Sequence, residues 1–210
     1  MRWSGWAVTR ASAGRRAYTV PASGPAAAVH LTTVVRLPAP ITEALAPALD
    51  RLRALGPGHH WYPPETMHVT VQNLDGAVPA DRVEQGAGDL VAAHPPFRLT
   101  VRGLGVAPGA VYALALPGDA TLRSLRAALG RLAAGRHPRR PQVGRGLGHA
   151  NLARFSGPVT TGLLAELARM GRQDFGSFTV GEVELVRTDR LLSPAGTTTL
   201  ARLPLAGRSG

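Results

Sequence analysis

The fold of this chain is decided by the stretch MHVTVQNL, residues 67–74. Apolar and polar residues alternate along it, which is the pattern of a β-strand with one buried face and one polar face toward a cleft. On such a strand residues i and i+2 point the same way, so His68 and Thr70 present an imidazole and a hydroxyl side by side. The stretch therefore predicts a strand whose polar face carries a proton-transfer group beside a hydrogen-bond donor.

A second stretch, GHANLARF at residues 148–155, repeats this pattern with a histidine 81 residues after the first one. Here His149 is followed two positions later by Asn151. Neighbouring apolar segments recur at nearly the same spacing, so the chain is one unit written twice: strand, helix, histidine strand, helix, strand. This duplication predicts two lobes related by a pseudo-twofold axis, with repeats over about residues 28–109 and 110–207.

Four stretches carry apolar residues at helical spacing and predict amphipathic helices. Pro47 lies inside the first of them and is expected to kink or delay that helix. Apolar segments bounded by Gly and Pro turns predict the remaining strands, and the mixture indicates an α+β fold. The helices are expected at 41–55, 79–93, 120–134 and 160–170, and the further strands at 29–38, 97–106, 111–116, 180–191 and 197–203.

Length and composition favour one two-lobed domain over residues 28–207, because 210 residues with 44% hydrophobic content can bury a substantial core. Residues 1–27 are expected to form either a loose tail or an additional edge strand. The chain has no cysteine, which excludes disulfides and thiolate metal sites. Its apolar runs are too short to span a membrane, and the opening segment lacks the apolar core of a secretory signal. A cytoplasmic monomer is therefore expected.

The net charge is +11, and all 24 basic residues are arginines. Such an excess favours polyanionic partners, and the flat guanidinium group suits bidentate contact with phosphate. A chain rich in Ala, Gly, Pro and Arg and without lysine is also what a strongly biased genome produces. The charge therefore indicates long-range attraction of nucleic acid, and it leaves open whether that affinity was selected.

The residues around both histidines resemble a known family. The stretch WYPPETMHVTV at residues 61–71 resembles the first signature of the two-histidine phosphoesterase superfamily, in its bacterial branch of 2'-5' RNA ligase-like proteins and RNA 2',3'-cyclic phosphodiesterases. Residues 148–155 are similar to the second signature, and the resemblance covers about residues 28–207. It implies a bilobal fold in which two antiparallel sheets line a central V-shaped groove and the helices pack outside.

The activity that the resemblance implies is hydrolysis of a 2',3'-cyclic phosphate to a 2'-phosphomonoester, or reversible joining of RNA ends through a 2'-5' linkage. Such a reaction needs attack by water, protonation of the departing ribose oxygen and neutralisation of the phosphoryl oxygens. Histidine can take either proton-transfer role near neutral pH. We expect His149 to act as the base and His68 as the acid, although the sequence does not fix this direction. Thr70 and Asn151 would donate to the phosphoryl oxygens.

No metal or other cofactor is expected, since no clustered carboxylates exist to hold an ion. The expected partners are RNA with cyclic phosphate ends or small cyclic nucleotides. Asn151 departs from the Thr or Ser of the family signature, and its longer amide places the donor farther from the backbone. Activity with altered geometry and a site relaxed into a binding pocket both stay open.

Four further residues are candidates for substrate binding. Arg154 matches the arginine of the second signature, but strict alternation turns it away from His149 unless a β-bulge brings it back. Trp61 and Tyr62 either stack on an RNA base or lie buried between the lobes. Gln72 shares the predicted face of the first histidine.

Two other functions compete with a phosphodiesterase acting on RNA ends. One is a non-catalytic RNA or nucleotide binder that keeps a basic groove but has lost turnover. The other is an esterase for a small cyclic nucleotide or for a metabolite that carries a phosphodiester.

Overall fold

The computed structural model describes residues 30–74, 79–134, 147–189 and 191–207. Residues 1–27, for which a tail or an edge strand was expected, lie outside this part of the chain. The described helices are α2 (Ala39–Leu55), α3 (Ala80–Ala92), α4 (Thr121–Ala134) and α5 (Thr161–Arg169), together with a short 3₁₀ turn, Pro64–Thr66. The described strands are β1 (His30–Arg36), β2 (His60–Trp61), β3 (His68–Asn73), β4 (Phe97–Ala107), β5 (Ala110–Pro117), β6 (Gly148–Arg154), β7 (Asp174–Val180), β8 (Glu182–Thr188) and β9 (Thr198–Pro204).

The strands form one antiparallel sheet in the order β7-β4-β5-β6-β3-β1-β8-β9, with β2 added to β6. The predicted α+β class is confirmed. The two expected sheets are the halves on either side of β3 and β6, which join them through the single residue pair Val69–Ala150. The two histidine-bearing strands are therefore the centre of the sheet.

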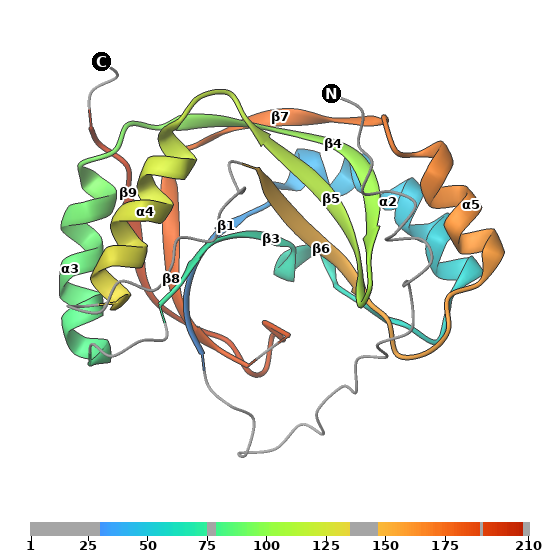
Figure 1. Cartoon of the computed structure of the whole chain (residues 1–210), viewed down its shortest axis with the longest axis horizontal. Helices are drawn as coiled ribbons and strands as arrows, with labels where there is room; N and C mark the ends of the chain where they lie inside the picture. Colours follow the sequence, from blue (N-terminus) through green and yellow to red (C-terminus); the bar gives the residue numbers. More distant parts are fainter. Residues whose placement is uncertain (1–29, 75–78, 135–146, 190, 208–210) are drawn as a thin grey trace.

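Each half of the sheet combines strands from both ends of the chain. β4 follows α3 in sequence but pairs with β5, whereas β8 comes near the end of the chain and pairs with β1. The helices are exchanged in the same way: α4 packs against β3 and α3, and α2 packs against β7 and α5. Figure 1 shows the resulting arrangement, with α3 and α4 at one end of the molecule and α2 and α5 at the other.

The four helices begin and end within about two residues of the predicted positions. Leu45, Leu49 and Leu52 are buried along one face of α2, as the spacing predicted. The expectation that Pro47 delays this helix was wrong, because α2 begins at Ala39 and runs through the proline. Pro47 lies on the exposed side of the helix, where water can take up the carbonyl that a proline leaves without its helical N–H partner. Within the described residues, every helix is too short or too polar to cross a bilayer.

Alternation on the central strands separates a core face from a polar face. Val69 and Val71 on β3 and Ala150 and Leu152 on β6 are at most 3% exposed and belong to the hydrophobic core. Burying these side chains contributes about 1–3 kcal/mol for each of the larger ones and pins the register of both strands. The histidines consequently lie on the opposite face.

Both histidine strands contain an irregularity at the same place in the motif. The register of β3 against β1 passes from Thr70 to Gln72, and the register of β6 against β5 passes from Asn151 to Ala153. One extra residue, at position 71 in the first case and 152 in the second, is thus inserted three positions after each histidine. Such β-bulges shift the alternation of every residue that follows.

Candidate active site

The two motifs face each other across the central strand pair. Because β3 and β6 are antiparallel around Val69 and Ala150, His68 falls opposite Asn151 and Thr70 falls opposite His149. The two histidines are then diagonal neighbours on one face, and the charge of His149 is among those that lower the pKa of His68. Two imidazoles and two hydrogen-bond donors therefore surround one small area of the sheet.

His68 is held in one orientation and is only 3% exposed. Its Nδ1 lies 2.7 Å from the carbonyl oxygen of Thr66, so Nδ1–H donates to that oxygen and the neutral ring keeps its lone pair on Nε2. Burial is the main cause that lowers the pKa of His68 to about 4; the charges of Arg36, Arg154 and His149 act in the same direction, against the opposing effect of the Thr66 carbonyl. At neutral pH this imidazole is uncharged.

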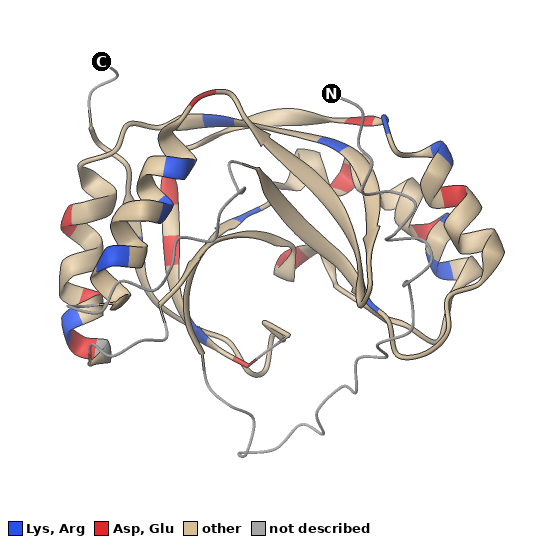
Figure 2. Ribbon diagram, viewed as in Figure 1, with Lys and Arg blue, Asp and Glu red and all other residues tan. Residues whose placement is uncertain are grey.

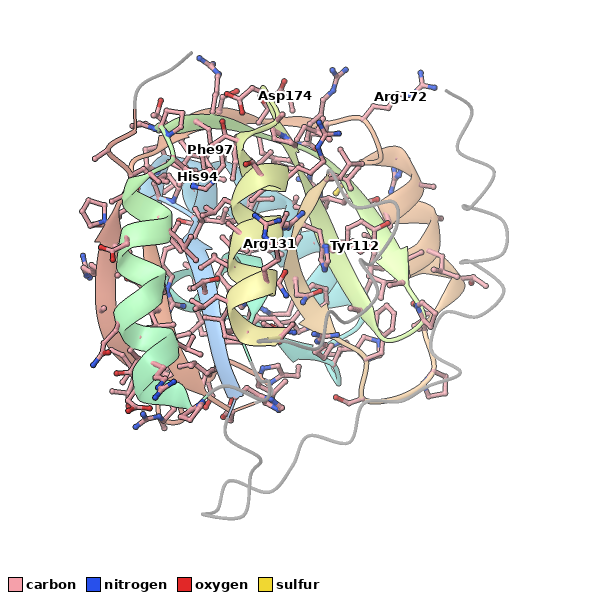
Figure 3. All side chains as sticks on the ribbon, turned by 60° about the vertical axis from the view of Figure 1, so that its left-hand side comes forward. His94, Phe97, Tyr112, Arg131, Arg172 and Asp174 are labelled. Atoms are coloured by element: carbon pink, nitrogen blue, oxygen red, sulfur yellow. The ribbon has the colours of Figure 1, made fainter. Side chains whose placement is uncertain are left out.

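His149 has a different environment, since it is exposed on β6. The ring of Tyr112 contacts it edge to face, with 5.8 Å between ring centroids. Tyr112 lies on β5 (Figure 3), is paired with Asn151, and has a raised hydroxyl pKa because it is partly buried. Its ring covers Gly105, where an added Cβ would lie 2.5 Å from the ring carbon Cζ. Tyr112 was missed in the sequence, although alternation along the predicted strand 111–116 places it beside the second motif.

Arg154 lies on the histidine face of β6, and its charge is one of those that lower the pKa of His68. Its Nε is 3.5 Å from the hydroxyl oxygen of Tyr62. The bulge at Leu152 explains this placement, since one extra residue returns Arg154 to the histidine face. The β-bulge that Arg154 needed in order to share a face with His149 is therefore present in β6.

Of the two aromatic candidates, neither presents an open ring to the histidine face. Tyr62 is 2% exposed, with its ring edge to face against His68 at a centroid distance of 6.4 Å. Trp61 is partly buried against the core and donates from its indole Nε1 to the carbonyl oxygen of Gly56 at 2.9 Å. Of the two alternatives weighed for these residues, burial is the one observed.

Gln72 does not join the site. The bulge at Val71 turns it to the other face, where its amide lies beside Gly130 of α4 and donates to the carbonyl oxygen of Asn73 at 3.0 Å. The prediction that Gln72 shares the face of His68 was therefore wrong. The bulge in β6 returns Arg154 to the histidine face, and the equivalent bulge in β3 turns Gln72 away from it.

Arg36, which lies next to His68, and its ion-pair partner Glu184 were also missed. Arg36 is paired with His68 across β1 and β3, and its Nε donates to Glu184 Oε2 at 2.9 Å. The buried Glu184 is further paired with Arg202, at 3.6 Å between Oε1 and Nη2. Arg36 Nη1 also lies 3.4 Å from the Thr66 carbonyl oxygen that orients His68. The only sequence signal for Arg36 is a charge at the end of a predicted buried strand.

Arg36 and Arg154 bring positive charge to the site, and further basic residues lie on α4, which packs against β3 (Figure 2). Among the described residues, no group of three or more His, Asp or Glu side chains gathers where it could hold a metal ion. The groups that the face does offer are imidazoles, a hydroxyl, an amide and guanidinium ions. These are proton donors, proton acceptors and anion ligands.

Two antiparallel strands at the centre of an α+β fold, each presenting a histidine and a hydrogen-bond donor to one face, define the class of two-histidine phosphoesterases. Residues 41–191 match the 2'-5' RNA ligase superfamily. The chain belongs to this superfamily.

Individual relatives agree with this placement. The chain is 29% identical over 156 residues, 70% of its own length and 82% of the relative's, to a protein of Methanothermobacter thermautotrophicus named RNA 2',3'-cyclic phosphodiesterase. The crystal structure of TT0787 from Thermus thermophilus matches with a TM-score of 0.65 at 25% identity, covering 86% of this chain and all of TT0787. LigT of E. coli, solved in complex with NADP+, matches with a TM-score of 0.60 at 23% identity over 84% of this chain and 98% of LigT.

Proposed function

We propose that this protein opens 2',3'-cyclic phosphates, on RNA ends or on nucleotides, to 2'-phosphomonoesters by acid–base catalysis without a metal ion. The observation that carries the proposal is the placement of His68 and His149 as diagonal neighbours on the two central strands. The name of the Methanothermobacter relative, RNA 2',3'-cyclic phosphodiesterase, supports the same substrate class.

His68 is assigned as the general base. Its Nδ1–H is engaged by the Thr66 carbonyl and its pKa lies near 4, so at neutral pH it offers an unprotonated Nε2. A histidine with this pKa would be a poor reservoir of protons at neutral pH, which argues against its serving as the acid. The roles expected from the sequence are therefore exchanged in this proposal, and His149 becomes the acid.

The reaction then runs in one displacement. Water loses a proton to His68 Nε2 while its oxygen attacks phosphorus, the bond from phosphorus to the ribose 3'-oxygen breaks, and His149 protonates that oxygen. The products are a 2'-phosphomonoester and a free 3'-hydroxyl. Each positioned proton-transfer group typically contributes roughly 10²–10⁴-fold to the rate.

Hydrogen-bond donors opposite each histidine would stabilise the negative charge that develops on the phosphoryl oxygens. The Thr70 hydroxyl and the Asn151 amide share the histidine face, and Arg154 adds a positive charge at its edge. Asn151 also distinguishes this site from the family signature, which has Thr or Ser at this position. We expect Asn151→Thr to retain activity, because a hydroxyl also donates to a phosphoryl oxygen, and any change to appear in kcat more than in KM.

The test is incubation of the full chain with an oligonucleotide that ends in a 2',3'-cyclic phosphate, in the presence of a chelator. We expect release of a 2'-phosphate end, and a loss of at least about 10²-fold in His68→Ala and in His149→Ala. His59→Ala is a matched control, because His59 packs on Phe155 and accepts from the Ser156 amide, outside the catalytic pair.

Two outcomes would contradict the proposal. Tight, strongly salt-dependent binding of the oligonucleotide with no turnover would identify a nucleic-acid binder. Turnover of a small phosphodiester that carries no 2',3'-cyclic phosphate, with none on a 2',3'-cyclic phosphate of an oligonucleotide or a mononucleotide, would identify an esterase for other small phosphodiesters.

A further inference from the structure

The central strands hold together over a short distance only. β3 and β6 share the single pair Val69–Ala150 and separate on either side of it. We call each place where the two strands diverge a fork. At one fork β2 pairs with β6, and the Tyr62 amide donates to the carbonyl oxygen of Leu152 at 3.0 Å. The bulged residue of β6 is therefore supported by backbone hydrogen bonding.

On the other side a side chain occupies the fork. Arg126 of α4 donates from Nη2 to the carbonyl oxygen of Thr70 and from Nε to that of Val71, both at 2.9 Å. Its Nη1 donates to the carbonyl oxygen of Leu147, also at 2.9 Å. One guanidinium group thus links β3 to the residue that precedes β6.

The bulge at Val71 makes this arrangement possible. Successive carbonyls of a regular strand point to opposite edges, whereas the extra residue disrupts the ladder and lets the carbonyls of Thr70 and Val71 converge. Leu147 precedes His149 by two residues, as Thr66 precedes the histidine that its carbonyl orients. Arg126 therefore holds the backbone at Thr70 in the first motif and the backbone two residues before His149 in the second motif.

We propose that Arg126 is a positioning residue that sets the separation and alignment of the two catalytic motifs by bonding backbone carbonyls from both. Because these donors bond backbone carbonyls, we assign Arg126 a role in positioning and not in contact with the reacting atoms. The planar guanidinium group supplies these three donors in fixed directions, and the compact ammonium group of lysine does not reproduce that geometry. This inference rests on the proposed function, because it assigns a consequence for catalysis to the geometry.

The proposal predicts a specific kinetic signature for Arg126→Met. The methionine keeps much of the apolar stem and removes the three donors, so the strands lose their link at the fork while the core stays intact. We expect kcat to fall by about 10–100-fold, because a displacement of roughly 1 Å in a reacting group can cost about 10²-fold. KM for the cyclic phosphate should change by less than about 3-fold, since ground-state binding tolerates small misalignment better than the transition state does.

A spectroscopic readout separates positioning from general destabilisation. Imidazole NMR signals of His68 and His149 should shift in the folded Arg126→Met protein without substrate. Arg126→Lys should recover part of kcat. Arg131→Met is the matched control, because Arg131 is an exposed arginine further along the same helix (Figure 3), and it should keep the wild-type kcat and spectrum.

The proposal is overturned if folded Arg126→Met shows wild-type kcat and unmoved imidazole signals, or if its lost activity equals the fraction unfolded. Should that variant fail to fold, the same measurements on Arg126→Lys decide, and wild-type values there would overturn it. Absence of turnover in the wild-type protein would instead refute the proposed function. In that case the imidazole signals alone still report whether Arg126 fixes the two motifs.

Discussion

At the scale of single residues, the hydrogen bond and the burial of His68 determine the expected pH dependence. A general base must be unprotonated, so kcat/KM should rise with pH through the pKa of the free enzyme, near 4, instead of near the usual 6.5. The opposite role gives the opposite sign, because a His68 acid would lose its proton above pH 4 and the rate would fall there. A pH–rate profile between pH 3.5 and 8 distinguishes these cases.

The contribution of the Arg36 charge to the lowered pKa of His68 can be tested by substitution. Arg36 lowers the pKa of His68 and also neutralises the buried Glu184. Arg36→Met removes a positive charge near His68 and leaves Glu184 paired with Arg202, so the loss of that charge favours the imidazolium. We expect NMR titration to give a higher His68 pKa and the rising limb of kcat/KM to move to higher pH by the same amount. A lower pKa in this variant would show that the charges are arranged differently.

At the scale of elements, the contact between β4 and β5 positions the ring beside His149. Gly105 leaves room for Tyr112, and an alanine Cβ at this position would overlap the ring. We expect Gly105→Ala to displace the ring, lower the stability by about 1–3 kcal/mol and reduce kcat. The double variant Gly105→Ala/Tyr112→Ala should be no less stable than Tyr112→Ala, as a thermal-denaturation cycle would reveal. Additive losses would mean that the ring already lies elsewhere.

The helix α2 contains Pro47, and the packing of its buried face keeps it helical despite the hydrogen bond that the proline removes. Pro47 deprives one carbonyl of its helical hydrogen bond, on the exposed side of a helix whose other face is buried. Pro47→Ala should therefore raise the free energy of unfolding, by up to about 3 kcal/mol. Chemical denaturation measures this, and kcat should not change. A loss of stability would indicate that the proline ring makes contacts worth more than the hydrogen bond.

The helices and histidine strands were predictable because each is encoded by local periodicity, as the leucines of α2 and the alternation around His68 illustrate. The fate of Gln72 and Arg154 was not fully predictable, because a single inserted residue leaves no periodic pattern yet reverses the face of everything after it. Pairing partners were equally inaccessible. β2 is only two residues long, and the predicted strand 180–191 is interrupted at Gly181, with β7 before it and β8 after it.

At the scale of the whole molecule, the exchange of strands and helices ties the two halves into one unit. β4 lies between β5 and β7, β8 lies between β1 and β9, and α4 packs on β3. Neither half of the sheet can form from one sequence repeat alone. The catalytic pair thus depends on long-range contacts throughout the fold, which folding theory associates with slow, cooperative folding.

This connectivity predicts how the protein unfolds. Fragments covering residues 28–109 and 110–207 should each be unfolded when expressed separately, because each lacks strands that complete its half of the sheet. The intact chain should lose secondary structure and the environment of both histidines in one transition, monitored by circular dichroism and by imidazole NMR signals in urea. If one histidine lost its native signal at clearly lower urea than the other, the halves would be separable units. The central pair Val69–Ala150 would then be a docking contact between two domains, and the alignment of the acid with the base would depend on that interface.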